Sequence, residues 1–311
     1  MPQMTPAQAR VIDPVLTEVA RGYQHAAFAG MALFPLVPVG ARGGKIIQFG
    51  KEHFRLYNTA RAPGGQVTRI TSSYSSQSYA LEQHAIEEGV PYELMDDASQ
   101  VPGVDLGAAA VRRGMDIIGL RLEKAQADLA RDATKYAASN KVTLSGTSQW
   151  SDDTSDPVKA VEDYKETVRS QIGVRPNTLL VGGQVFAKLK THAKIVDRIK
   201  YTSRDVATPE LLAALFGVER FVVGDAIYVD DAGNTSDVWG KDAILAFTAI
   251  GGIADAGRPS YGYTYRLREM PVVEEPYQDR TVRSWVYQIA DEIVPVITGA
   301  DAGFLIQNAV A

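Results

Sequence analysis

The sequence contains no cysteine. Disulfide bonds and thiolate-bound metals are therefore excluded, and a reducing cytoplasm is a compatible environment. Basic residues are in the minority, with 32 Lys and Arg against 37 Asp and Glu, a formal net charge of -5. A dedicated nucleic-acid-binding protein normally carries a basic surface. The charge balance thus argues against a tight nucleic-acid binder.

Long hydrophobic runs are also absent. The most apolar stretch, residues 26–39, is interrupted by Pro35 and Pro38 and is shorter than the roughly 20 residues that a membrane-spanning helix needs. No basic segment precedes it and no small-residue cleavage site follows, so it does not read as a signal peptide. We interpret it as buried packing and predict neither targeting nor membrane association.

The composition is otherwise that of a folded protein. The chain has 311 residues, of which 45 % are hydrophobic and 22 % charged, enough for two sub-domains. Residues 1–35 read as an arm in which Thr5-Pro6 and Pro14 start short helices that need a packing partner. Residues 40–92 read as a hairpin, with strands at 45–49 and 67–81 around a turn at 62–65. A two-stranded hairpin is marginal alone, which argues for an assembling protein.

The clearest helix signal covers residues 104–138. Its apolar positions recur at steps of four and three and define one stripe: Val104, Ala108, Val111, Met115, Ile118, Leu122, Ala125 and Leu129. Arg112 with Asp116, and Lys124 with Asp128, are spaced as i,i+4 pairs. The heptad-like spacing permits a coiled coil, but Gly107, Gly114 and Gly119 favour packing on a sheet.

The remaining residues alternate helix and strand signals. Asp156 and Gly173 bound one helix, and Thr208 and Gly217 bound another whose predicted core residues are Leu211, Leu212 and Leu215. Short buried strands are predicted at 178–181 and 221–223. Longer strands are predicted at 261–267 and 280–289, with a turn at 276–279 between them, and a last strand at 301–306.

The histidines do not form a convincing metal site. His84 and Glu87 have a spacing that would place two ligands on one face of a helix, but no third ligand lies near them. The other three are scattered along the chain, namely His25, His53 and His192. For all four, a surface or hydrogen-bonded role is the favoured interpretation.

Catalytic motifs are incomplete. Gly182-Gly183 followed by Lys188 lacks the second glycine and the Ser or Thr of a phosphate loop, so a strand-to-helix turn is favoured. Residues 258–262 approach a nucleophile elbow but place Arg258 where a glycine is needed. Ser260 is therefore interpreted as a strand residue.

Two further groups of residues carry atoms of the kind that bind ligands. The pairs Asp152-Asp153 and Asp230-Asp231 lack the loop spacing of a calcium site and are typical of turns. Tyr261, Tyr263 and Tyr265 lie at alternate positions, hence on one strand face, where a core or subunit interface is favoured over base stacking. We predict no catalytic, cofactor-binding or metal-binding residue, and no enzyme.

An ordered set of segments resembles the major capsid proteins of tailed bacteriophages, which share the Johnson fold. The segments are Leu33–Val39, the hairpin, the long helix, Arg175–Thr178, Asp197–Tyr201, Leu211–Val218, Val223–Ala226, Trp239–Asp242 and Asp301–Gly303. The resemblance implies an α+β fold with an N-terminal arm, an extended loop, a peripheral domain with a long spine helix and a mixed α/β axial domain. The implied boundaries are 1–38 for the arm, 39–92 for the loop, 93–150 with 259–296 for the peripheral domain, and 151–258 with 297–311 for the axial domain.

The resemblance also implies a function and partners. A structural protein of this kind self-assembles into pentamers and hexamers of an icosahedral virion shell around double-stranded DNA, which it contacts weakly. Assembly would occur in the host cytoplasm with a separate scaffolding protein, a portal and, as a further candidate, a decoration protein. Lys200, Arg204 and Asp205 would help line the axial rim. Lys45, Lys51 and Asn308 do not predict a covalent cross-link.

Two alternatives stay open at this point. An encapsulin-like bacterial shell protein shares the fold and would enclose a cargo enzyme instead of DNA. A cytoplasmic α/β enzyme or ligand-binding protein would be a monomer or small oligomer whose melting temperature rises with its ligand.

Overall fold

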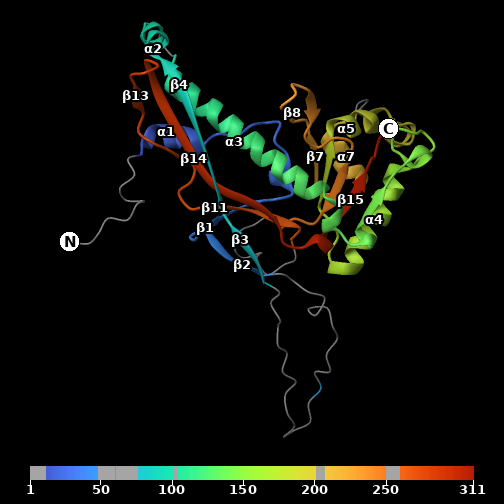
Figure 1. The fold of residues 1–311 in the computed structure, drawn as a ribbon. Helices are drawn as coiled ribbons and strands as arrows, with labels where there is room; N and C mark the ends of the chain where they lie inside the picture. Colours follow the sequence, from blue (N-terminus) through green and yellow to red (C-terminus); the bar gives the residue numbers. More distant parts are fainter. Residues whose placement is uncertain (1–11, 48–59, 61–75, 101–103, 201–206, 250–259) are drawn as a thin grey trace.

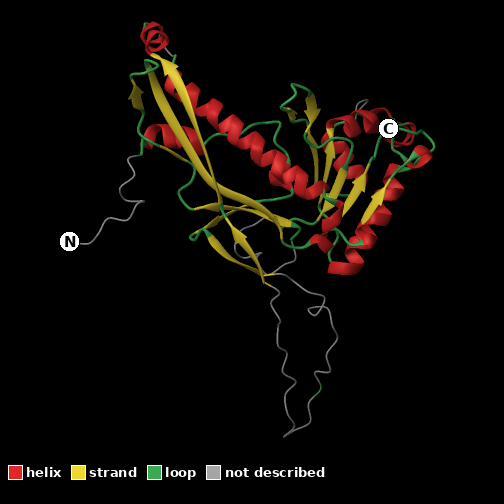
Figure 2. Cartoon of the chain, in the orientation of Figure 1, coloured by secondary structure: helices red, strands yellow, loops and turns green. Residues whose placement is uncertain are grey.

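A computed structural model describes residues 12–47, 60, 76–100, 104–200, 207–249 and 260–311, and the secondary structure below is that of these residues. Two sheets lie at opposite ends of the molecule, and one long helix runs from the first to the second (Figure 1). Helices gather around the smaller sheet, whereas the long strands of the larger sheet are accompanied mainly by that one helix (Figure 2).

The α-helices are α1 (Pro14–Arg21), α2 (Tyr92–Ser99), α3 (Leu106–Arg131), α4 (Pro157–Ile172), α5 (Gly183–Thr191), α6 (Ala193–Ile199) and α7 (Pro209–Phe216). The strands are β1 (Leu36–Val39), β2 (Gly43–Ile47), β3 (Ser76–Ala80), β4 (Glu82–Pro91), β5 (Lys141–Thr143), β6 (Thr178–Gly182), β7 (Arg220–Gly224), β8 (Ile227–Val229), β9 (Thr235–Asp237), β10 (Ala243–Ala246), β11 (Gly262–Leu267), β12 (Val272–Val273), β13 (Tyr277–Asp279), β14 (Ser284–Ile297) and β15 (Gly303–Gln307).

The larger sheet is organised around β14. This strand pairs with β4 along one edge and with β11, β12 and β13 along the other, while β1 joins the far side of β11 in parallel. The predicted strand 280–289 was wrong at both ends, because β14 starts at Ser284 and continues through Asp291 and Glu292. Arg266 and Arg42 pair with these two buried carboxylates at 2.9 and 2.6 Å. The strand therefore continues through two charged residues beyond its predicted end.

The turn before β14 also differs from the prediction. Residues 277–279, predicted as a turn, form the short strand β13 and pair with β14. The reversal instead occupies residues 280–283, where Arg283 adopts a positive φ of 50°. The polar composition of 276–279 suited a turn, but pairing with β14 decides its conformation.

The long helix α3 packs on the larger sheet, as its glycines predicted. A Cβ at Gly107 would lie 2.9 Å from the Tyr287 hydroxyl, and one at Gly114 would lie 2.3 Å from a methyl of Ile289. The predicted span 104–138 was too long. Asp105 caps the helix through a 2.9 Å bond from the Ala108 N–H, and extended backbone at Asp132 ends it before two 3-10 turns.

The buried stripe of α3 changes direction along its length. Ala108, Val111, Met115 and Ile118 are buried as predicted, against the larger sheet. Beyond them the buried positions are Glu123, Gln126, Ala127 and Ala130 instead of Leu122, Ala125 and Leu129. The second half of the helix packs into the core of the smaller sheet. The single apolar stripe predicted from the sequence assumed one packing surface along the whole helix, and it therefore fails for this half.

The helix α1 has its packing partner within the chain. The Asp13 carboxylate accepts hydrogen bonds from the N–H groups of Val15 and Leu16 at 2.9 Å, which starts the helix. Its buried side packs in the core formed by α3 and the larger sheet, and the Asp13 N–H donates to the Val273 carbonyl at 3.1 Å. The interpretation of residues 26–39 as buried packing is only partly correct, because 36–39 form the edge strand β1 and Leu36 is exposed. The predicted start at Thr5-Pro6 lies outside the described residues.

The smaller sheet has the order β5-β15-β10-β6-β7, with β6 and β7 parallel. Every residue of β6 is buried, which confirms the predicted strand at 178–181. The predicted helix ends are confirmed too, since Asp156 and Thr208 accept from backbone N–H groups and Gly173 and Gly217 have φ values of 71° and 59°. In α7 the buried residues are Leu212, Ala213 and Phe216, while Leu211 and Leu215 are only partly buried.

A two-stranded hairpin, β2 with β3, stands beside the larger sheet. Its register pairs Gly43 with Ala80 and Ile47 with Ser76. The Tyr79 ring stacks on Tyr265 of β11 with centroids 4.6 Å apart, which attaches the hairpin to the sheet. Only Leu81 separates β3 from β4, and the two strands follow one line in Figure 1. The predicted turn at 62–65 lies outside the described residues.

Candidate functional site

The junction between the two sheets is built around a buried carboxylate on α3. Glu123 is 1 % exposed. Its Oε1 accepts from the Ala29 N–H at 2.8 Å and from the Trp239 indole N–H at 2.6 Å, and its Oε2 accepts from the Gly30 N–H at 2.9 Å. One side chain thereby joins the N-terminal segment, the long helix and the loop before β10. Burial raises the pKa of Glu123, and these hydrogen bonds offset part of that rise.

An ion pair between Arg131 and Asp242 fixes the C-terminal end of α3. The Arg131 Nε lies 2.7 Å from Asp242 Oδ2, and its Nη1 donates to the Val238 carbonyl at 3.0 Å. The other Asp242 oxygen accepts from the Asn308 N–H at 2.9 Å. The end of the long helix is thus bonded to the segment before β10 and to the residue after β15.

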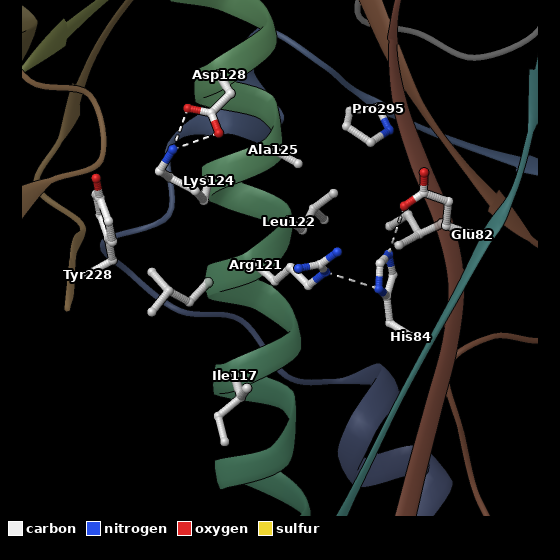
Figure 3. A pocket seen from close by; sticks show the side chains of 12 residues that line it. Glu82, His84, Ile117, Arg121, Leu122, Lys124, Ala125, Asp128, Tyr228 and Pro295 are labelled. Carbon is white, nitrogen blue, oxygen red and sulfur yellow. Dashed lines mark hydrogen bonds and ion pairs between the residues drawn. The ribbon is translucent and has the colours of Figure 1, made fainter. Parts of the chain in front are cut away.

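A groove lies between α3, the β4–β14 pair and Tyr228 (Figure 3). It has a volume of about 440 Å³. Arg121 Nε donates to His84 Nδ1 at 3.3 Å, and Lys124 pairs with Asp128 at 2.6 Å, as predicted from their spacing. The groove holds charges of both signs and apolar surface from Ile117, which is 48 % exposed. Its side chains suit contact with another surface and lack a nucleophile with an adjacent base.

The predicted histidine interpretations can be followed in the structure. His84 and Glu87 lie on strand β4, not on a helix, and an odd spacing on a strand places them on opposite faces. His192 is buried and its Nε2 lies 3.1 Å from Ser155 Oγ, while its Nδ1 accepts from the Lys194 N–H at 3.3 Å. This confirms a hydrogen-bonded role for His192.

The other two histidines do not approach a ligand cluster. His25 stacks on Phe28 with centroids 4.4 Å apart and lies 4.0 Å from Asp116. The predicted pair of Asp116 with Arg112 is thus replaced by this contact. His53 lies outside the described residues. Within the described ranges, no group of three His, Cys, Asp or Glu residues is placed to hold a metal ion.

The residues of the incomplete motifs have structural roles where they fall within the described ranges. Gly182 and Gly183 form the turn from β6 into α5, and a Cβ at Gly182 would lie 2.0 Å from the Gly240 carbonyl oxygen. Lys188 is exposed in the last turn of α5. Ser260 is buried just before β11, not within it, and its Oγ accepts from the Ala249 N–H at 3.1 Å. Neither the Gly182-Gly183 turn with Lys188 nor Ser260 forms part of a catalytic arrangement.

The acidic pairs are turn residues, as predicted. Asp152 Oδ1 accepts from the Thr154 N–H at 2.8 Å. Asp230 Oδ1 accepts from the N–H groups of Ala232 and Asn234 at 3.0 and 2.8 Å, closing the turn between β8 and β9. A hydrogen bond from the Thr154 hydroxyl, together with that from the Thr154 N–H, lowers the pKa of Asp152, and the hydrogen bonds from Asn234 lower the pKa of Asp230.

The three tyrosines do not share one strand face. Tyr261 precedes β11, is fully buried and hydrogen-bonds through its hydroxyl to Tyr136. Tyr263 and Tyr265 are half-buried on β11, and burial, with smaller effects of Tyr263 and Tyr79, raises the pKa of Tyr265 to about 12. Tyr261 is therefore a core residue, whereas Tyr265 stacks on Tyr79 of the hairpin and Tyr263 lies against Tyr265.

Several apolar side chains of the described residues remain exposed. They are Leu94 on α2, Ile117 on α3, and Ile227 and Val229 on β8. Among the described helices none is both long and apolar enough to cross a membrane.

Other predicted residues cannot be assigned a role. Arg204, Asp205 and Lys51 lie outside the described residues, whereas Lys200 follows α6, Lys45 is exposed on β2 and Asn308 is exposed after β15. Sequence reasoning missed Glu123 and Asp242. A glutamate within a helix normally marks its solvent face, so no sequence signal indicated the burial of Glu123.

The arrangement of a long helix on an extended sheet beside a helix-flanked second sheet is that of viral capsid proteins. The structure matches the putative capsid protein of a prophage of E. coli CFT073 with a TM-score of 0.60 at 14 % identity, over 96 % of this chain and 99 % of that one. It matches a phage-related protein of Bordetella bronchiseptica RB50 with a TM-score of 0.83 at 44 % identity, over 97 % and 98 % of the two chains. The fold is therefore the predicted α+β capsid fold.

The family follows from sequence. The family model described as phage major capsid protein E matches residues 135–285. The major capsid protein of Burkholderia phage BcepMu is 40 % identical over 97 % of this chain and 98 % of its own length. The chain belongs to the family of phage major capsid proteins and is a structural protein of the phage capsid.

Proposed function

We propose that many copies of this chain form the icosahedral head that encloses the double-stranded DNA of a tailed bacteriophage. The observation that carries the proposal is the shape of the subunit, whose hairpin β2–β3 and tip at β4–α2 project from two compact cores. Closed shells need subunits with complementary, non-identical contact surfaces. The relationship to phage proteins along almost the whole chain favours this reading over an encapsulin shell or an enzyme.

The domain division is part of the proposal. We assign 1–38 to an arm, 93–150 with 259–296 to the peripheral domain, and 151–258 with 297–311 to the axial domain. The extended loop was predicted as 39–92. The ten-residue pairing of β4 with β14 supports grouping 82–91 with the peripheral sheet.

Assembly of the head would involve further proteins. We expect a separate scaffolding protein, a portal and, as a further candidate, a decoration protein, acting in the host cytoplasm before the virion is complete. Contact with DNA is expected to be weak and salt-dependent because the chain has a net charge of -5. We expect no enzymatic activity.

The proposal is tested by expressing the chain alone and with the products of its neighbouring genes. Negative-stain imaging and size-exclusion chromatography should show closed shells in one of these conditions. A variant lacking residues 50–73 retains β2 and β3 and should stay soluble without forming shells. Normal shells from this deletion, or a stable monomer in every condition for the full chain, would contradict the proposal.

A further inference from the structure

Positive charge is concentrated in the two helices α5 and α6. The whole chain contains 32 Lys and Arg against 37 Asp and Glu, whereas residues 184–200 contain five Lys or Arg and a single Asp. All of these residues lie within the described ranges. A chain that is acidic overall therefore has a short segment of strong positive charge, whose cations are Lys188, Lys190, Lys194, Arg198 and Lys200.

Three of the lysines surround the corner between the two helices. His192 is the one residue between α5 and α6, and it is buried. Its Nε2 lies 3.1 Å from Ser155 Oγ and its Nδ1 accepts from the Lys194 N–H at 3.3 Å, so hydrogen bonds hold the corner in place. Lys188 and Lys190 precede His192 by four and two residues, and Lys194 follows it by two. We call these three lysines the basic corner.

Two of the three ammonium groups are oriented by neighbours. Lys190 Nζ lies 5.0 Å from the centroid of the Phe186 ring, and Lys194 Nζ donates to the Thr154 carbonyl at 2.6 Å. Neither contact removes the positive charge. Side chains that are already oriented lose less conformational entropy when they bind an anion.

Carboxylates of the same chain do not neutralise the basic corner. Among the described residues, none of its three lysines forms an ion pair. Asp197 lies 2.7 Å from Lys200, and Asp156 lies 3.5 Å from Arg198, so these two acids pair with the other cations of the segment. Three positive charges therefore remain available to an external anion.

The composition of the corner favours a polyanion over another protein as its partner. The exposed side chains between the lysines are small or polar, namely Ala187, Thr191 and Ala193. Protein–protein interfaces are enriched in aromatic residues, Met and Arg and are depleted in Lys. Lysine neutralises the phosphates of duplex DNA whatever the base sequence. The basic corner thus has the chemistry of a non-specific contact with a DNA backbone.

We propose that the basic corner lies on the inner face of the shell and contacts the phosphates of the enclosed DNA. The inference rests on the proposed function, because the shell and its DNA both belong to that proposal. Three cations give one subunit a weak affinity, but the many copies of a shell present the corner repeatedly to the same DNA molecule, so the contacts act together. The negative charge of the rest of the chain limits contact elsewhere.

A first experiment measures the binding of the purified chain to a fluorescent DNA duplex of about 30 base pairs by anisotropy. The test variant carries Lys188→Gln, Lys190→Gln and Lys194→Gln. Each phosphate contact contributes about -0.9 to the slope of log affinity against log salt concentration. Between about 50 and 200 mM salt, the original chain should therefore lose about 40-fold more affinity than the variant.

A matched control removes three other exposed cations that form no ion pair in the described part of the chain, through Arg112→Gln, Lys135→Gln and Arg268→Gln. It changes the net charge equally and should bind DNA like the original chain, and circular dichroism should show both variants folded. An equal loss of binding in the control, or the same salt slope in the test variant as in the original chain, would overturn the inference.

A second experiment locates the corner in the particle. A small acylating reagent, read by mass spectrometry, should modify Lys188 and Lys190 less in DNA-filled shells than in emptied ones. Equal protection in both would place the corner between subunits, and equal reactivity in both would place it on the outer face; either result would refute the inference and leave the proposed function intact. If the unchanged chain forms no shells, the proposed function fails as well.

Discussion

Replacing Glu123 with alanine should be one of the most damaging single changes to the unassembled subunit. The side chain is buried and accepts hydrogen bonds from three N–H groups, those of Ala29, Gly30 and Trp239. Glu123→Ala removes both acceptor oxygens and leaves three buried donors without a partner. Glu123→Gln retains one acceptor oxygen and should cost less.

The magnitude follows from the number of orphaned donors. A buried donor without a partner costs about 1–3 kcal/mol, and disruption of a buried charged network costs about 3–5 kcal/mol. Relief of the buried charge offsets part of this cost, so we expect Glu123→Ala to lower the free energy of unfolding by about 3–5 kcal/mol.

The pH dependence of that loss has a definite sign. Burial raises the pKa of Glu123 above its usual value of 4.5. The folded state therefore binds the proton more tightly than the unfolded state does, and this stabilising contribution is complete below pH 4.5 and is lost as pH rises through the folded-state pKa. The difference in stability between the original chain and Glu123→Ala should thus be larger in acid than at neutral pH.

Urea denaturation of the purified subunit, followed by tryptophan fluorescence between acidic and neutral pH, measures both quantities. Asp128→Ala on the exposed side of the same helix is the control and should change stability by less than about 0.5 kcal/mol. A loss below about 1 kcal/mol for Glu123→Ala, or a difference that grows with pH, would refute the reasoning.

Two other changes test the junction and its neighbouring turn. Arg131→Met removes the partner of buried Asp242 and should cost about 1–3 kcal/mol, because Arg131 itself is one-third exposed. Arg169→Met, on the exposed face of α4, is the control and should leave stability nearly unchanged. Equal losses for the two variants in urea denaturation would contradict the assignment. Gly182→Ala places a Cβ 2.0 Å from the Gly240 carbonyl oxygen and should lower the free energy of unfolding by about 1–3 kcal/mol or more. In the control Gly40→Ala the new Cβ meets no atom within 4 Å, so stability should be nearly unchanged. Similar melting temperatures for the two variants would count against the close packing at Gly182.

Features fixed by neighbouring residues could be predicted from sequence. Asp156 and Gly173 bound α4 because a carboxylate caps free N–H groups and glycine accepts a positive φ. The buried strand at 178–181 was predicted from its apolar run and the glycines after it. Each of these signals lies within a few residues of the structure that it specifies.

Features that depend on distant residues could not be predicted in the same way. The continuation of β14 through Asp291 and Glu292 depends on arginines at positions 266 and 42. The burial of Glu123 depends on donors supplied by residues about 90 and 116 positions away. A local pattern indicates charge but not its partner, and the partner decides whether the charge is buried.

The position of β15 in the smaller sheet has a consequence for synthesis. This strand, residues 303–307, pairs with both β5 and β10 and so lies inside the sheet although it is made after every other strand in it. Until the ribosome has translated it, β5 has no pairing partner among the described strands, and β10 lacks one of its two neighbours. A polypeptide cut short before residue 303 would therefore carry an open, apolar sheet edge and be left to proteases instead of entering a growing particle.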